Sequence, residues 1–112
     1  MDQELRFKQW LINWQPKNVT VNFGKNVWKE ETLIAYTDAL KNITSDLNID
    51  ENKIKKNLFD YVNTRKYLIA YEKIVNHPNF KSLKYYPIAK KALTRYKDFL
   101  FDSKKESEIK YS

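Results

Sequence analysis

Apolar residues recur at helical spacing along most of this chain, and one segment shows the pattern most clearly. Between residues 29 and 47 the large apolar positions step by three or four residues; they are Leu33, Tyr36, Leu40, Ile43 and Leu47. Such steps place all of these side chains on one face of an α-helix. Glu30 and Glu31 fall in the first turn, where the helix dipole favours negative charge. The pattern predicts a helix over 29–47 that buries this stripe.

A shorter stripe of the same kind lies near the N-terminus. Its members are Phe7, Trp10, Leu11 and Trp14. We predict a helix from Gln3 to about Trp14, because Pro16 disfavours helical geometry in the residue before it. After the second helix, Asp50 is an N-cap candidate for a short third helix. That helix is expected to bury Ile54, Leu58, Phe59 and Val62.

Two further helices are predicted in the second half of the chain. The fourth is capped by Asn63 or Thr64 and ends at the Asn-His-Pro sequence of residues 76–78. Its apolar stripe is Tyr67, Leu68, Tyr71, Ile74 and Val75. A short helical turn anchored by Phe80 and Leu83 follows, and Pro87 suits the first turn of the fifth helix. The fifth stripe is Ala89, Ala92, Leu93, Tyr96, Phe99 and Leu100.

Residues 15–28 form the least regular segment. Val19, Val21 and Phe23 alternate with polar residues, as in a short strand, but no second run matches them. We expect an extended loop or one edge of a minor hairpin there. Residues 103–112 carry little apolar content and are interpreted as a tail or the start of a linker. The prediction is therefore an all-α fold, a compact orthogonal bundle of about five helices in one domain over 1–102.

Composition agrees with this class and narrows the chemistry. The 112 residues are 42% hydrophobic and 15% aromatic, enough to form one core, and include one Gly, three Pro and no Cys. A chain so poor in Gly and Pro lacks the regular turn signals of a β-sandwich. The absence of Cys excludes disulfides, thiolate metal sites and a Cys nucleophile. Neither a membrane-spanning run nor a signal peptide is evident, and we expect a soluble cytoplasmic protein with no membrane partner.

The chain contains few of the residues and motifs that are typical of catalytic sites. His77 is the only histidine, and it lies at a helix end, where a structural or solvent-exposed role is expected. A single Gly excludes the glycine-rich loops that hold nucleotide phosphates. The paired carboxylates Glu30–Glu31 and Asp50–Glu51 lie near predicted helix starts, where capping and dipole effects explain them. We predict no enzymatic activity, no metal and no cofactor.

The net charge is +7, and it is unevenly distributed. Residues 1–51 carry six Lys or Arg and eight Asp or Glu, whereas residues 52–112 carry fifteen and six, which gives −2 and +9. An asymmetry of this kind points to a polyanionic partner such as nucleic acid. The alternative is the ordinary surface charge of a Lys-rich chain. The nucleic-acid-binding candidates are Arg65, Lys66, Lys81, Lys84, Lys90, Lys91, Arg95 and Lys97.

Four segments together carry a family resemblance. They are FKQWL at 7–11, ETLIAYTDALKNI at 31–43, LFDYVNTRKYLIAYEKIVNHPNFKSL at 58–83 and YPIAKKALTRYKDFL at 86–100. In this order they resemble the helical N-terminal module that precedes McrB-like AAA+ GTPases, HNH nucleases and related restriction or defence proteins of bacteria. The helical order is also similar, more loosely, to the SAM-like core-binding domain of tyrosine recombinases.

The resemblance implies a DNA-recognition module that delivers DNA to a separate nuclease or AAA+ motor, in the same chain or complex. Two features depart from the family pattern: the start of the last helix at residues 84–87 and the length of the 15–28 segment. The prediction is a non-catalytic DNA-binding or targeting module of a restriction or phage-defence protein. The alternative is a protein-interaction or oligomerisation adaptor that uses Trp14, Phe23 and Trp28.

Overall fold

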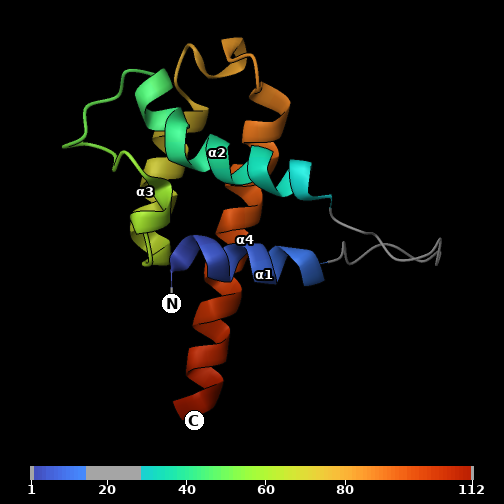
Figure 1. Ribbon diagram of the computed structural model, residues 1–112. Helices are drawn as coiled ribbons and strands as arrows, with labels where there is room; N and C mark the ends of the chain where they lie inside the picture. Colours follow the sequence, from blue (N-terminus) through green and yellow to red (C-terminus); the bar gives the residue numbers. More distant parts are fainter. Residues whose placement is uncertain (1, 15–28, 112) are drawn as a thin grey trace.

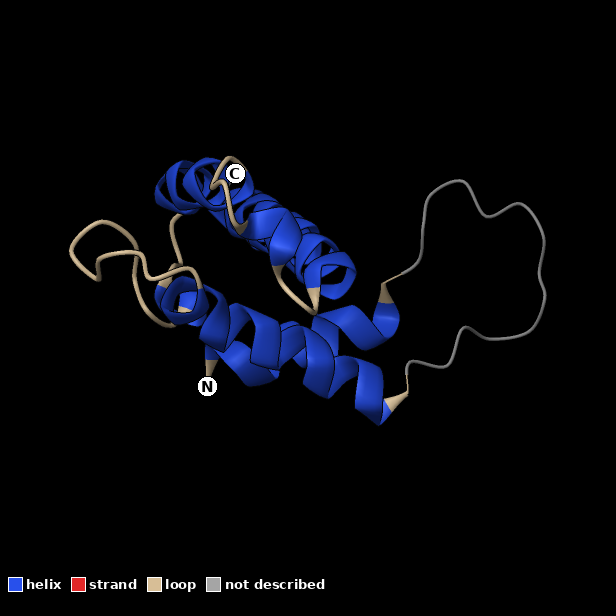
Figure 2. Cartoon of the chain, turned by 90° about the horizontal axis from the view of Figure 1, so that it is seen from above, coloured by secondary structure: helices blue, strands red, loops and turns tan. Residues whose placement is uncertain are grey.

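The described part of the chain is helical throughout. A computed structural model describes residues 2–14 and 29–111, with side chains up to residue 103. It contains the helices α1 (Gln3–Asn13), α2 (Glu30–Asp46), α3 (Thr64–Val75) and α4 (Tyr86–Tyr111). Two short 3₁₀ turns, Leu58–Asp60 and Phe80–Ser82, lie before α3 and before α4. No strand occurs within these ranges (Figure 2), and the extended segment predicted at 15–28 lies outside them.

Helix α4 is the element around which the others pack. Helices α1, α2 and α3 all contact it, as does the turn Phe80–Ser82. Figure 1 shows α1 and α2 lying across α4, while the last turns of α4 extend past the other helices. The helical backbone of α4 therefore continues through residues 103–111, where the sequence predicted a tail.

Side-chain caps begin two of the helices, and a left-handed backbone conformation ends a third. The carboxylate of Asp2 accepts the Glu4 N–H at the start of α1, and Asn63 Oδ1 accepts the Lys66 N–H at 3.0 Å at the start of α3. Helix α2 ends because Asn48 adopts a left-handed conformation with φ 56°. This geometry lets the N–H groups of Asn48 and Ile49 donate to the carbonyls of Ser45 and Thr44.

The short helix predicted around residues 54–62 is wrong as an α-helix. The backbone of residues 48–63 is irregular apart from the turn Leu58–Asp60. Asp50 does not cap a helix; its carboxylate accepts the Asn52 N–H at 2.9 Å and closes a local turn. Asn57 similarly accepts the Phe59 N–H at 3.0 Å. Short polar side chains thus satisfy backbone groups that a helix would otherwise pair, which favours turns.

Tertiary hydrogen bonds hold this irregular segment on the core. The Thr44 hydroxyl donates to the Lys55 carbonyl, and the Lys55 N–H donates to the Tyr61 hydroxyl, both at 3.0 Å. Ile54 is fully buried, as predicted, whereas Val62 is 71% exposed and does not belong to the core. The structure therefore has four α-helices in its described residues rather than about five, and the missing one is replaced by an anchored loop.

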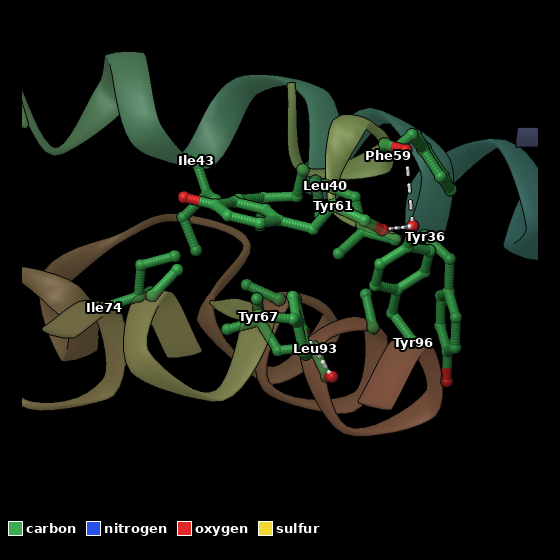
Figure 3. Close-up of a cluster of buried hydrophobic side chains, with 14 of the residues drawn as sticks. Tyr36, Leu40, Ile43, Phe59, Tyr61, Tyr67, Ile74, Leu93 and Tyr96 are labelled. Carbon is green, nitrogen blue, oxygen red and sulfur yellow. Dashed lines mark hydrogen bonds between the residues drawn. The ribbon is translucent and has the colours of Figure 1, made fainter. Parts of the chain in front are cut away.

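The core is rich in aromatic rings, and Tyr96 of α4 lies at their centre. Its ring makes edge-on contacts with Phe7, Phe59 and Tyr67, with centroids 5.1–5.4 Å apart. The Tyr96 hydroxyl donates to the Tyr61 carbonyl at 2.7 Å, as Figure 3 shows. Every predicted stripe residue of α4 is buried. One side of α4 is therefore buried in the core, and the opposite side faces solvent.

Candidate nucleic-acid interface

The solvent side of α4 carries a set of lysines. Lys90 and Lys91 are exposed, and Lys97 is half-buried near the same surface. Lys90 and Lys97 are seven residues apart, so they lie two turns apart on one face, with their Cα atoms about 10 Å apart along the axis. We call Lys90, Lys91 and Lys97 the α4 basic face. None of the three forms an ion pair with a carboxylate among the described side chains.

Lys97 bends toward α3. Its Nζ atom lies 5.4 Å from the ring centroid of Tyr71, within the range of a cation–π interaction. This contact places a positive charge beside the groove between α3 and α4. The groove has a volume of about 280 Å³, and Arg65, Leu68 and Phe101 are among its lining residues. Phe101 is one turn beyond Lys97 on α4. Lys97 itself does not line the groove, whose described charged lining residues are Arg65 and Glu72.

Arg95 differs from the other candidates because its guanidinium group already contacts an aromatic ring and a carboxylate of the protein. The guanidinium carbon lies 4.1 Å from the ring centroid of Trp14, and Nη1 lies 3.4 Å from Asp98 Oδ2. Its side chain is only 22% exposed. Arg95 therefore joins the end of α1 to α4, and among the eight candidates it alone forms an ion pair within the described part of the chain.

The remaining candidates lie at the two ends of this surface. Arg65 and Lys66 occupy the first turn of α3 and are exposed, whereas Lys81 and Lys84 are exposed just before α4 begins. Because Arg65 lines a groove with Phe101, it lies near the far end of the packed part of α4. Residues 86 and 101 are about 22 Å apart along a helix. The structure thus spreads the candidates along α4 rather than gathering them at one point.

Sequence reasoning missed Arg6. This exposed residue of α1 lines a pocket of about 570 Å³ together with Arg65 and Leu100. The two arginines are far apart in sequence, and only the packing of α1 and α3 against α4 brings them to one pocket. A helical wheel places Arg6 off the apolar stripe of α1, but no local pattern distinguishes it from other surface cations.

Two tyrosines at the start of α4 have packing roles. Tyr85 and Tyr86 are both half-buried. The Tyr85 hydroxyl donates to the Asp46 carboxylate at the end of α2, and burial together with this contact raises the Tyr85 pKa. The Tyr86 ring packs edge-on against Phe80 at 5.1 Å. Neither tyrosine is a fully exposed stacking platform for nucleic-acid bases.

His77 also has a local structural role, because its Nδ1 atom accepts the Asn79 N–H at 3.0 Å. Within residues 2–14 and 29–103, no three His, Asp or Glu side chains group as they would to hold a metal ion. Over the same part of the chain, none of the helices combines the length and apolar character that crossing a membrane requires.

Comparison with known proteins adds no family: no family model, no curated protein and no solved structure matches the chain significantly. Functional interpretation therefore depends on the geometry of the charged surface and on the sequence resemblance described above.

Proposed function

We propose that this protein is a non-catalytic DNA-binding module that contacts the phosphate backbone through the α4 basic face. The observation that carries the proposal is the set of lysines on the solvent side of α4 without carboxylate partners among the described side chains. Cations that are not neutralised within the protein can displace the counterions condensed on DNA, and this release supplies sequence-independent affinity.

The spacing of these lysines suits a regular polyanion. The axial separation of about 10 Å between Lys90 and Lys97 corresponds to roughly three steps of one DNA strand, which rises about 3.4 Å per phosphate. Lysine acts as a flexible point charge, whereas base readout in the major groove favours bidentate side chains such as arginine. Arg95 is held by Trp14 and Asp98. The proposal is therefore backbone binding by lysines rather than base recognition by Arg95.

The biological setting is proposed from the sequence resemblance. The segments that resemble the N-terminal module of McrB-like and HNH-type proteins contribute mainly buried positions, such as Phe7, Tyr36 and Tyr96. We propose a targeting role in a restriction or phage-defence system, with a nuclease or AAA+ motor in the same chain or complex as the catalytic partner.

The test is fluorescence anisotropy of a labelled short DNA duplex at two salt concentrations. We expect the double substitution Lys90→Gln and Lys91→Gln to weaken binding at least tenfold at low salt. The same substitutions are expected to reduce the slope of log K against log salt by about 2, because each lost phosphate contact removes about 0.9. The matched control is Lys29→Gln with Lys53→Gln, which removes the same charge from two exposed lysines on other segments.

Two results would contradict the proposal. One is the absence of DNA binding by the unmodified protein at low salt. The other is an equal loss of affinity in the test and control proteins, because it would mean that only net charge matters and that the α4 basic face is not the site.

A protein-interaction function is the second candidate, and it is favoured by apolar residues at the α3–α4 groove. Ile69 is 53% exposed and Phe101 is 41% exposed, and both line this groove. Among the aromatic residues first assigned to this role, Trp14 is half-buried under Arg95, and Phe23 and Trp28 lie outside the described residues. A salt-insensitive oligomer in light scattering, together with no DNA binding, would favour this function.

A further inference from the structure

A pocket lies at the junction of three helices. It has a volume of about 570 Å³ and is formed by α1, the start of α3 and the middle of α4. A pocket of this size is within the range of small-ligand sites and exceeds the volume of a single phosphate group. Its polar lining consists of Gln3, Arg6, Asn63, Thr64, Arg65 and Ser103.

The described lining of this pocket carries two positive charges. Arg6 and Arg65 come from different helices, and no Asp or Glu is among the lining residues. Neither arginine forms an ion pair with any described carboxylate. Two arginines that line one pocket suit a phosphate ligand chemically, because each guanidinium presents several N–H donors in a fixed plane.

The floor of the pocket is held by the core. Gln3 Nε2 donates to the Tyr96 hydroxyl at 3.2 Å, and that hydroxyl in turn donates to the Tyr61 carbonyl. Burial raises the pKa of Tyr96 to about 12; the hydrogen bond from Gln3 lowers it, the Asp60 carboxylate raises it and the positive charge of Arg6 lowers it. At the α3 side, Asn63 Oδ1 already accepts the Lys66 N–H. The pocket therefore offers mainly donors to a ligand.

We propose that the Arg6–Arg65 pocket binds a phosphate group of the DNA strand that lies along the α4 basic face. The proposal rests on the proposed DNA-binding function for the source of the phosphate. The position of Arg65 supports it, because this residue also lines the α3–α4 groove with Glu72 and Phe101, and Phe101 is one turn beyond Lys97 on α4. The phosphate is either an internal diester of the strand or a monoester at its 5′ end, since both offer the same oxygen acceptors.

The first experiment compares four proteins on two duplexes of one sequence, with 5′-hydroxyl or 5′-phosphate ends. The proteins are the unmodified chain and the variants Arg6→Gln, Arg65→Gln and Lys53→Gln. Lys53 is the matched control, because it is an exposed cation that neither lines the pocket nor belongs to the nucleic-acid-binding candidates. We expect each arginine variant to weaken binding about tenfold and Lys53→Gln to weaken it no more than about twofold. Thermal melting verifies that all variants are folded.

The pattern across the two duplexes identifies the phosphate. A loss on both duplexes supports an internal diester, and a loss confined to the 5′-phosphorylated duplex supports a terminal monoester. Arginine variants that bind both duplexes as Lys53→Gln does would overturn the pocket while leaving the proposed function intact.

A second measurement separates failure of the pocket from failure of the proposed function. The unmodified protein is titrated with 5′-phosphorylated dithymidine, and the side-chain Nε–Hε NMR signals of the arginines are followed. Saturable shifts of the Arg6 and Arg65 signals, with no DNA binding by anisotropy, would support the phosphate pocket and refute the proposed function. The absence of saturable shifts in a protein whose DNA binding is unaffected by the arginine variants would refute the pocket alone.

Discussion

Ionisation of Tyr96 should make the protein less stable in alkali, and the magnitude follows from its surroundings. The Tyr96 side chain is fully buried in the aromatic core. Burial raises its pKa from the ordinary value of 10.0 to about 12. A group that holds its proton more tightly when folded stabilises the fold below the unfolded pKa, and this contribution is lost as pH rises through the folded pKa. For Tyr96 the relevant window is therefore pH 10 to 12.

At pH 11 the unfolded tyrosine is mostly ionised, whereas the folded one is mostly neutral. The shift of two pKa units then costs about 1.4 kcal/mol of unfolding free energy at pH 11, and about 2.7 kcal/mol once both states are ionised. The variant Tyr96→Phe has no proton to lose at this site. At pH 8 it should be less stable than the unmodified protein by about 1–2 kcal/mol, because the buried Tyr61 carbonyl loses its donor.

The difference between the two proteins should therefore almost vanish at pH 11. Urea unfolding followed by far-UV circular dichroism at pH 8 and pH 11 measures it, and the other tyrosines cancel because both proteins contain them. The control is Ile74→Val, a fully buried site without a titrating group, whose cost of about 0.5–1.5 kcal/mol should be the same at both pH values. A Tyr96→Phe penalty that is equal at pH 8 and pH 11 would refute the assigned burial of the hydroxyl.

Three further substitutions separate packing from charge on α4. Leu93→Ala should cost about 2–5 kcal/mol in unfolding free energy, because Leu93 is 1% exposed, and a much smaller fall in the thermal midpoint would mean that the α4 core face is misassigned. Arg95→Gln should lower stability by about 1 kcal/mol through its contacts with Trp14 and Asp98. Lys91→Gln, which has no such contacts, should leave the melting temperature unchanged, and equal melting of the two variants would contradict the structural role of Arg95.

The long helices were predictable from sequence because their apolar residues repeat with the period of the helix itself. Steps of three and four residues from Leu33 to Leu47 place the side chains on one face of an α-helix but not of a strand. All five stripe residues are buried. The 48–63 segment was not predictable in the same way. Ile54, Leu58 and Phe59 are buried as expected, but their spacing fits a helix and an anchored loop equally well. The deciding contacts, from Thr44 and Tyr61, are tertiary.

In the candidate site, too, helical phase predicts some features, whereas others depend on tertiary packing. Helical phase alone predicts that Lys90 and Lys91 face solvent, because the buried stripe of α4 fixes the opposite side. It does not reveal that Arg95 packs on Trp14, since this contact depends on how α1 crosses α4. Nor does it reveal that Arg6 and Arg65 share a pocket. Pairing of residues that are distant in sequence requires the packing angles of three helices, which no local pattern encodes.

The contact between α1 and α4 has a consequence for how the chain folds. Gln3 and Trp10 hydrogen-bond to Tyr96 and Asp102, partners more than ninety residues away in sequence. During synthesis, α1 emerges well before α4, and before then its described ring and ion-pair partners outside α1 are Phe59 and Lys41. The aromatic core around Tyr96 therefore closes only after α4 has left the ribosome, and until then part of the apolar face of α1 is exposed to solvent and to chaperones.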